Sequence, residues 1–212
     1  MVLSTADSGA KSLASLRRFV RQPQRGTEEH CELCAAQLAA MHSHLLEVKD
    51  KRVVCACEPC AILFSGHAAQ RYRRIPRDVE RLQNFVLDDQ EWNSLLIPIN
   101  LAFFVWSSSA GREVAHYPSP GGIMESSLDL EYWSTIVEHN PILAKLEPDV
   151  EGLLVNRISD SFQYYRAPID HCFRLVGIIR THWRGLSGGS EVWTEIGRFF
   201  DQLNQLAGGA IA

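Results

Sequence analysis

The sequence predicts an α+β fold in which a small, cysteine-rich N-terminal module packs on a larger, mixed and largely antiparallel domain. Three observations lead to this prediction. Five of the six cysteines lie between residues 30 and 64. Short apolar runs bounded by polar turns follow in the middle of the chain, as in β-hairpins. Apolar residues at helical spacing recur in the second half. Strands and helices in this mixed order are typical of α+β proteins.

The first half of the chain is expected to contain two hairpins. Apolar residues at helical spacing predict a short helix over residues 10–21 before the cysteines. The elements expected after it are a hairpin of "HLLEV" (44–48) and "RVVCA" (52–56), a strand over 71–76, a helix over 76–86, a buried strand over 95–107 and its return strand over 112–119. The segment "PSPGG" (118–122) is expected to break the chain, because proline and glycine interrupt regular structure.

The second half is expected to alternate helices and strands. Its predicted elements are a helix that begins at a Ser126–Asp129 capping box and stops at Pro141, strands over 152–159 and 162–168, a helix capped by Asp170 and closed by Gly185, and a helix capped by Ser190. Trp193, Ile196, Phe200 and Leu203 are expected on one face of the last helix. This pattern divides the chain into an arm that is disordered or helical (1–27), a cysteine module (28–66) and an α+β body (67–212).

Composition excludes several classes of protein. The formal net charge is −4 and the isoelectric point is near 6.1, so non-specific nucleic-acid binding is not expected. We interpret the arginines at 71, 73, 74 and 77 as a solvated strand edge.

No apolar run reaches the length of a membrane helix, and no secretory signal is recognisable. The sequence therefore predicts a cytoplasmic protein, in which clustered cysteines favour a metal or redox site over disulfides.

The strongest functional signal is a pair of C-x2-C motifs. Cys31 and Cys34 form the first, Cys57 and Cys60 form the second, and 22 residues separate them. Each motif turns two sulfurs toward one point, and the intervening hairpin can bring the two pairs together. Four thiolates about 2.3 Å from the ion make a tetrahedral zinc site. The spacing therefore predicts a zinc-ribbon-like module with these four cysteines as ligands.

Other interpretations of these cysteines remain open. The same four sulfurs suit iron, alone or in an iron–sulfur cluster. Cys55 is an alternative ligand that complicates any four-sulfur assignment. His30, His42 and His44 are further alternative ligands, for each of which a surface or supporting role is favoured. A metal-free dithiol site is the third possibility, because C-x-x-C is also a redox motif. Cys172, far away on an apolar helix face, is expected to be a buried hydrophobic residue.

Elsewhere the sequence indicates little chemistry. The glycine-rich segment from His182 to Glu191 joins two helices and is explained by a tight turn, with anion binding as the alternative. No nucleophile elbow or phosphate-binding loop is present, so we assign no catalytic residue. Whether the chain is an enzyme stays open at this point, with a non-catalytic role favoured.

Several long motifs together resemble a known bacterial family. They are "CELC…HSHLL…RVVCACEPCAILF", "IPINLAFFVWSS", "AHYPSPGG", "LLVNRI", "PIDHCFRLVGIIRTHWRGLSGG" and "EVWTEIGRFF". The family is one of unknown function whose genes often accompany nickel–iron hydrogenase genes, and the resemblance covers about residues 27–205. It implies a cytoplasmic accessory protein with a hydrogenase subunit or precursor as partner. It also implies that Cys55 is more than a bystander.

The leading hypothesis is a non-catalytic zinc protein that docks on a nickel–iron hydrogenase or helps it mature. The first alternative is an iron or iron–sulfur protein that transfers electrons to or from the hydrogenase. The second alternative is a thiol–disulfide oxidoreductase. Visible colour in the purified protein separates the first two, and a disulfide-reduction assay tests the third.

Overall fold

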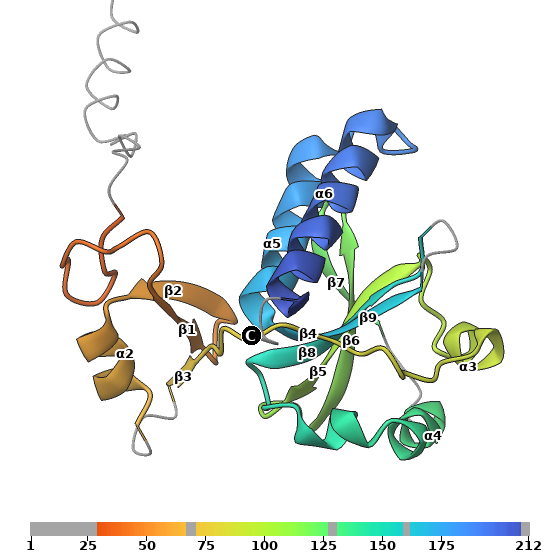
Figure 1. Cartoon of the computed structure of the whole chain (residues 1–212), viewed down its shortest axis with the longest axis horizontal. Coiled ribbons are helices and arrows are strands. Elements are labelled where there is room, and N and C mark those ends of the chain that lie inside the picture. The colour runs from red at the N-terminus through yellow and green to blue at the C-terminus, as the bar shows by residue number, and fades with distance from the viewer. Residues whose placement is uncertain (1–28, 67–70, 127–130, 159–161, 209–212) are drawn as a thin grey trace, which may run out of the picture.

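Two antiparallel sheets organise the chain (Figure 1). The computed structural model describes residues 29–66, 71–126, 131–158 and 162–208. We call the described residues from 29 to 74 the cysteine module and those from 75 to 208 the body. The module holds a three-stranded sheet, and the body holds a six-stranded sheet. The predicted α+β class, with antiparallel sheets and an N-terminal cluster of four cysteines, is confirmed.

The sheet of the cysteine module has the strand order β2-β1-β3. Its elements are β1 (Ser43–Glu47), β2 (Arg52–Ala56), α2 (Glu58–Phe64) and β3 (Tyr72–Arg74). The predicted hairpin is confirmed as β1 and β2, and the strand expected over 71–76 is β3. Because β3 pairs with β1, the chain returns to this sheet after the helix.

The sheet of the body has the strand order β4-β9-β8-β5-β6-β7. Its strands are β4 (Glu80–Arg81), β5 (Leu101–Ser107), β6 (Arg112–Ser119), β7 (Gly122–Ser126), β8 (Glu151–Asn156) and β9 (Gln163–Pro168). Its helices are α3 (Asp89–Ser94), α4 (Glu131–His139), the 3-10 helix η1 (Pro141–Lys145), α5 (Ile169–His182) and α6 (Gly189–Gly208). Helix α4 ends just before Pro141, as predicted.

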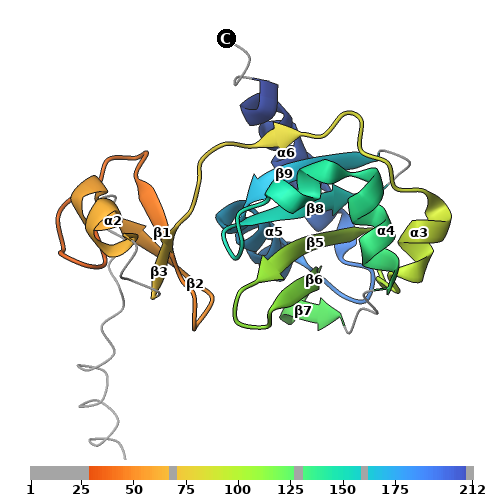
Figure 2. The same cartoon turned by 90° about the horizontal axis from the view of Figure 1, so that it is seen from below.

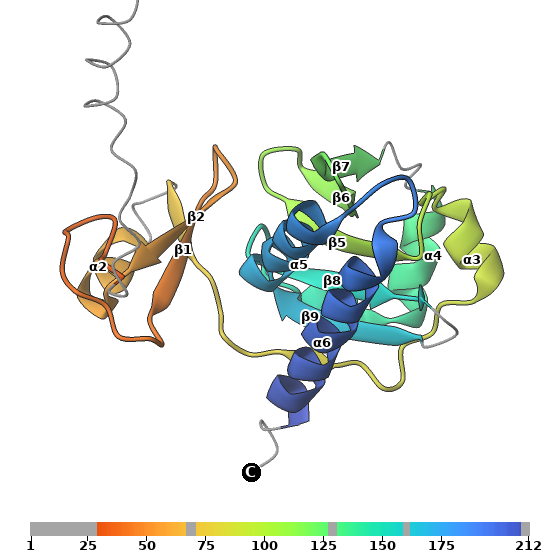
Figure 3. The same ribbon diagram turned by 90° about the horizontal axis from the view of Figure 1, so that it is seen from above.

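Helices cover both faces of the body sheet. Helix α4 lies in front of the sheet in Figure 2, with α3 beside it, and α5 and α6 lie in front of the sheet in Figure 3. Side chains of β5 alternate between the two layers: Phe103 packs in the core under α5 and α6, and Phe104 packs in the core under α3 and α4. A strand that is buried on both faces has no polar side, which explains the unbroken apolar run "LAFFV".

The helix predicted over residues 76–86 is wrong. This segment is an irregular connection with a turn at residues 83–84, and it contributes the short strand β4, which pairs with β9. Val79 is buried in the core under α5 and α6, so tertiary packing overrides the local helical pattern. A helix forms slightly later, as α3, where Asp88 and Glu91 make a capping box. Residues 95–100 of the predicted long strand are not part of β5.

Two predicted helix caps are also wrong. Asp170 lies inside the first turn of α5, where its carboxylate binds His44 of the module. Ser190 lies inside α6, which begins at Gly189. Trp193 is 45% exposed rather than buried with the rest of its predicted face. The predicted break at 118–122 is a tight turn into the unpredicted strand β7.

Two sequence predictions lie outside the described residues. They are the helix over 10–21 and the Asp129 partner of the Ser126 capping box.

The module joins the body through its sheet. Leu46 of β1 is buried in the same core as α5 and α6, and Val53 packs against that core. Polar contacts surround this apolar junction. Arg73 pairs with Asp149 at 3.2 Å, and His44 binds Asp170 at 2.6 Å. The arginines of β3 and its flanks are thus held largely by acidic partners, which also include Glu47 and Glu58.

Gly152 is a site where one methyl group should destabilise the body. A Cβ atom there would lie 2.9 Å from the Phe104 carbonyl oxygen and 3.1 Å from Val105 Cγ2, in the centre of the sheet. We expect Gly152→Ala to lower the free energy of unfolding by about 1–3 kcal/mol. Gly177→Ala on α5 meets no atom within 4 Å and should stabilise by roughly 0.5–1 kcal/mol. Urea midpoints of the two variants measure this, and equal midpoints would contradict the crowding argument.

Candidate metal centre

The structure brings the four predicted cysteines together. Cys31 and Cys34 lie in the loop before β1, Cys57 is the N-cap of α2, and Cys60 lies in its first turn. All four sulfurs lie within 4.8 Å of one another, and the Cys34 and Cys57 sulfurs are 3.6 Å apart. Sulfurs bound to one tetrahedral zinc ion are about 3.8 Å apart, as bond lengths of 2.3 Å require. The four cysteines are therefore placed to bind a metal ion.

Local hydrogen bonds shape the first C-x2-C turn. The Ala35 N–H donates to the Cys31 carbonyl at 2.8 Å, and Ala35 takes a left-handed φ of 61°. Glu32 ties this loop to β2 from both sides: its N–H donates to the Cys55 carbonyl, and its carboxylate accepts from the Cys55 N–H, each at 2.9 Å. The loop therefore holds its sulfurs over the end of β2, where α2 begins.

The electrostatics of the cluster favour a cation. Burial raises the pKa of Cys31, but backbone N–H groups of Cys57 and neighbouring residues outweigh burial and lower it to about 6. Burial, together with the neighbouring thiols, raises the pKa of Cys60 to about 12. One thiolate thus forms readily, and further thiolates are opposed because each adds negative charge beside the first. A bound metal ion removes that penalty, and metal binding should release protons.

Two of the alternative ligands, Cys55 and His44, lie together in a group separate from the four cysteines. Ligand atoms of His42, His44 and Cys55 are within 4.8 Å of one another. His42, which the sequence also offers as an alternative ligand, is the third member of this group. Cys172 is fully buried in the body core, as predicted, and burial raises the pKa of its thiol far above the ordinary range.

Comparison with known protein families assigns the chain to a family. Residues 30–207, which span both the module and the body, match the Family of unknown function (DUF5947). The chain belongs to this family. A search of curated proteins and a search of solved structures each found no match. The association with hydrogenase genes stays a prediction.

The other features singled out in this DUF5947 protein have structural explanations. The segment from His182 to Glu191 forms a tight turn between α5 and α6, in which the Arg184 N–H donates to the Gly188 carbonyl at 2.9 Å. His182 and Glu191 at its two ends pair at 2.8 Å. Within the described residues, no helix has the length and apolar character that a membrane span requires.

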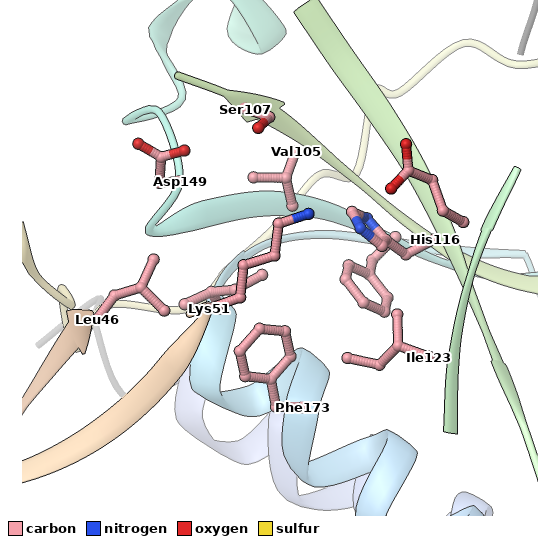
Figure 4. A pocket seen from close by; sticks show the side chains of 11 residues that line it. Leu46, Lys51, Val105, Ser107, His116, Ile123, Asp149 and Phe173 are labelled. Atoms are coloured by element: carbon pink, nitrogen blue, oxygen red, sulfur yellow. The ribbon is translucent and has the colours of Figure 1, made fainter. Parts of the chain in front are cut away.

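A pocket that the sequence did not reveal lies where the module meets the body. Its volume is about 270 Å³. Figure 4 shows the Lys51 amine of the module and the His116 ring of the body facing the same space. His116 is 8% exposed and stacks on Phe103, and its Nδ1 has no hydrogen-bond partner among the described residues. Burial lowers the pKa of His116 to about 4, so the ring is neutral at pH 7.

Proposed function

We propose that this protein is a non-catalytic metal-binding accessory protein, in which Cys31, Cys34, Cys57 and Cys60 hold a structural zinc ion. The observation that carries the proposal is the convergence of four sulfurs from a loop and a helix start. Closed sites of four thiolates are typical of structural zinc, because no position is left for a substrate. The module has only a small core, and two of its buried members are Cys31 and Cys60. A zinc ion would therefore supply much of its stability.

Metal analysis of anaerobically purified protein, with an absorption spectrum of the same sample, tests the zinc proposal. We expect the zinc content to fall by one ion per chain in Cys31→Ser and in Cys60→Ser, and we expect no visible absorption band. Cys172→Ala is the matched control and should keep its zinc, since Cys172 lies in the body core. Metal-free protein that catalyses disulfide reduction would overturn the proposal.

Iron bound by the same cysteines is the second candidate. Cys34 is exposed and Cys57 is half-buried, so one edge of the cluster reaches solvent. An exposed edge gives a redox partner close access to the metal. Iron with thiolate charge-transfer bands in the metal analysis would favour electron transfer to or from a hydrogenase and would replace the structural role.

The partner in this proposal is a nickel–iron hydrogenase subunit or its precursor, as the sequence resemblance implies. The surface of the module supports a docking role. Helix α2 turns Cys60 and Ala61 inward, and it leaves Ile62 63% and Leu63 72% exposed. Adjacent large apolar side chains on a helix surface are typical of a protein-binding site.

Charged substitutions on α2 test the docking surface. We expect Ile62→Glu with Leu63→Glu to weaken binding to a purified hydrogenase subunit at least tenfold, because burying two carboxylates removes the apolar contact. Leu96→Glu with Leu186→Glu is the charge-matched control on exposed residues of the body. Isothermal titration against each hydrogenase subunit measures the affinities. Failure of the unaltered protein to bind any of them would overturn the partner half of the proposal.

A further inference from the structure

Three ligand-type side chains outside the four-cysteine cluster gather at the module's sheet. His44 of β1 and Cys55 of β2 are directly paired across the hairpin, so their side chains point to the same side. His42 precedes His44 by two residues, which is the repeat of an extended chain. One ring nitrogen of each histidine and the sulfur of Cys55 lie within 4.8 Å of one another. The hairpin and the residue just before β1 therefore assemble a set of two nitrogens and one sulfur.

This set lies on the opposite face of the sheet from the four-cysteine core. Leu45 and Val54 face the core that contains Cys31 and Cys60. Leu46, which has the same parity as His44, enters the core of the body instead. The two groups of ligands are thus separated by the sheet, and the second one lies where the module meets α5.

Hydrogen bonds determine which nitrogen of each histidine is free. His44 Nδ1 is 2.6 Å from Asp170 Oδ2, and His42 Nδ1 is 3.0 Å from the Ala39 carbonyl. Glu29 Oε2 lies 3.4 Å from the same His42 nitrogen. All three partners are acceptors, so both Nδ1 atoms carry the hydrogen and both Nε2 atoms of the neutral rings carry a lone pair.

The two Nε2 atoms face each other at 3.2 Å. Two lone pairs at this distance repel unless a positive centre lies between them. Nitrogens bound to one tetrahedral zinc ion at 2.0–2.1 Å are about 3.3 Å apart. The observed separation therefore matches a pair of imidazoles that share one metal ion.

Asp170 supports such a site from the body. Metal-binding histidines commonly donate their other N–H to a carboxylate, which orients the ring and raises its basicity. Asp170 lies in the first turn of α5, where the helix N-terminus stabilises its charge, and its second oxygen accepts from the His171 N–H at 2.8 Å. Asp170 is thus not the helix cap that the sequence predicted. Its contact with His44 Nδ1 instead orients the His44 ring.

We propose that His42, His44 and Cys55 form a second metal site, for zinc or a similar borderline-soft divalent ion. Within the described part of the chain, no fourth histidine, cysteine or carboxylate ligand belongs to this group. Three protein ligands leave one position of a tetrahedral ion open to water or an exogenous ligand, unlike the closed four-cysteine site. The site is distinct from the one in the proposed function, and it ties the module to the body through Asp170.

Cobalt titration of the full-length apoprotein under anaerobic, reducing conditions tests the second site. Cobalt(II) replaces zinc and reports on sulfur ligation through its absorption. The unaltered protein should bind two equivalents per chain. His42→Ala, His44→Ala and Cys55→Ser should each bind one, with the tetrathiolate spectrum unchanged. His182→Ala and Cys172→Ala are matched controls that should keep two. The retained tetrathiolate spectrum shows that each variant is folded and that the first site is independent.

Asp170→Asn gives a second readout. We expect it to weaken the second cobalt equivalent 10- to 100-fold and to leave the first unchanged. Binding of only one cobalt equivalent by the unaltered protein would overturn the proposal. The rings of His42 and His44 would then share a proton between their Nε2 atoms. A change of the tetrathiolate spectrum in Cys55→Ser would also overturn it, because Cys55 would then belong to the first site.

Discussion

Removal of metal from the four-cysteine site is expected to unfold the cysteine module and to leave the body folded. The module's core is small and includes Cys31 and Cys60 themselves, so little apolar burial remains once the ligands separate. Structural zinc contributes roughly 10–16 kcal/mol of apparent binding free energy in isolated zinc fingers. The body has two larger cores that contain none of the four ligands. Loss of metal should therefore act locally.

Hydrogen exchange before and after treatment with a zinc chelator measures this effect. Amides of β1 and β2 should lose their protection, and amides of β5 and β8 should keep theirs. Cys60→Ser should reproduce the chelated pattern without chelator, because one ligand of the site is missing. Equal protection of β1 and β2 with and without metal would show that the apolar core alone folds the module.

Stability is expected to fall by about 3 kcal/mol as the pH decreases from 6.5 to 4, because of His116 alone. Burial lowers the pKa of His116 from 6.5 to about 4 in the folded protein, and the nearby Lys51 amine acts in the same direction. Glu125 opposes this shift weakly. The folded ring stays neutral in this pH range, and the unfolded chain takes up a proton. Proton uptake by the unfolded state alone favours unfolding.

The pH window follows from the two pKa values. Well above pH 6.5 neither state binds the proton, so His116 has no effect on the pH dependence there. Well below pH 4 both states bind it, and the loss is complete. Urea unfolding of the unaltered protein and of His116→Gln between pH 7.5 and 4 isolates this contribution by difference. His182→Gln is the control at a more exposed histidine. An identical pH dependence in His116→Gln would contradict the burial argument.

Features that depend on neighbours in the sequence were predictable. The hairpin of β1 and β2 follows from two apolar runs around "KDK", and helix α4 ends before Pro141 as proline requires. The unbroken apolar run "LAFFV" predicted a buried strand. The prediction holds because both faces of this strand are covered. The two C-x2-C motifs predicted the four-cysteine cluster, since each turn is local and the hairpin joins them.

Features that depend on distant residues were not predictable. Residues 76–86 have an apolar pattern compatible with a helix, but pairing of β4 with β9 and burial of Val79 keep them from forming one. Asp170 has the side-chain type and the position of a helix N-cap, but its carboxylate binds His44, which lies 126 residues away in the sequence. In both cases contacts with distant residues outweigh the local preference, and a local sequence pattern gives no information about such contacts.

The group of His42, His44 and Cys55 combines features that were predictable from the sequence with features that were not. The spacing of His42 and His44 is visible in the sequence, and it places both side chains on one side of a strand by itself. The partner of His44 across the hairpin is set by the β1–β2 register, which brings Cys55 opposite it. The docking of α5 then supplies Asp170. The sequence by itself determined the ligand types and their local spacing, and only the tertiary structure decided which of them meet, because register and docking depend on contacts between distant segments.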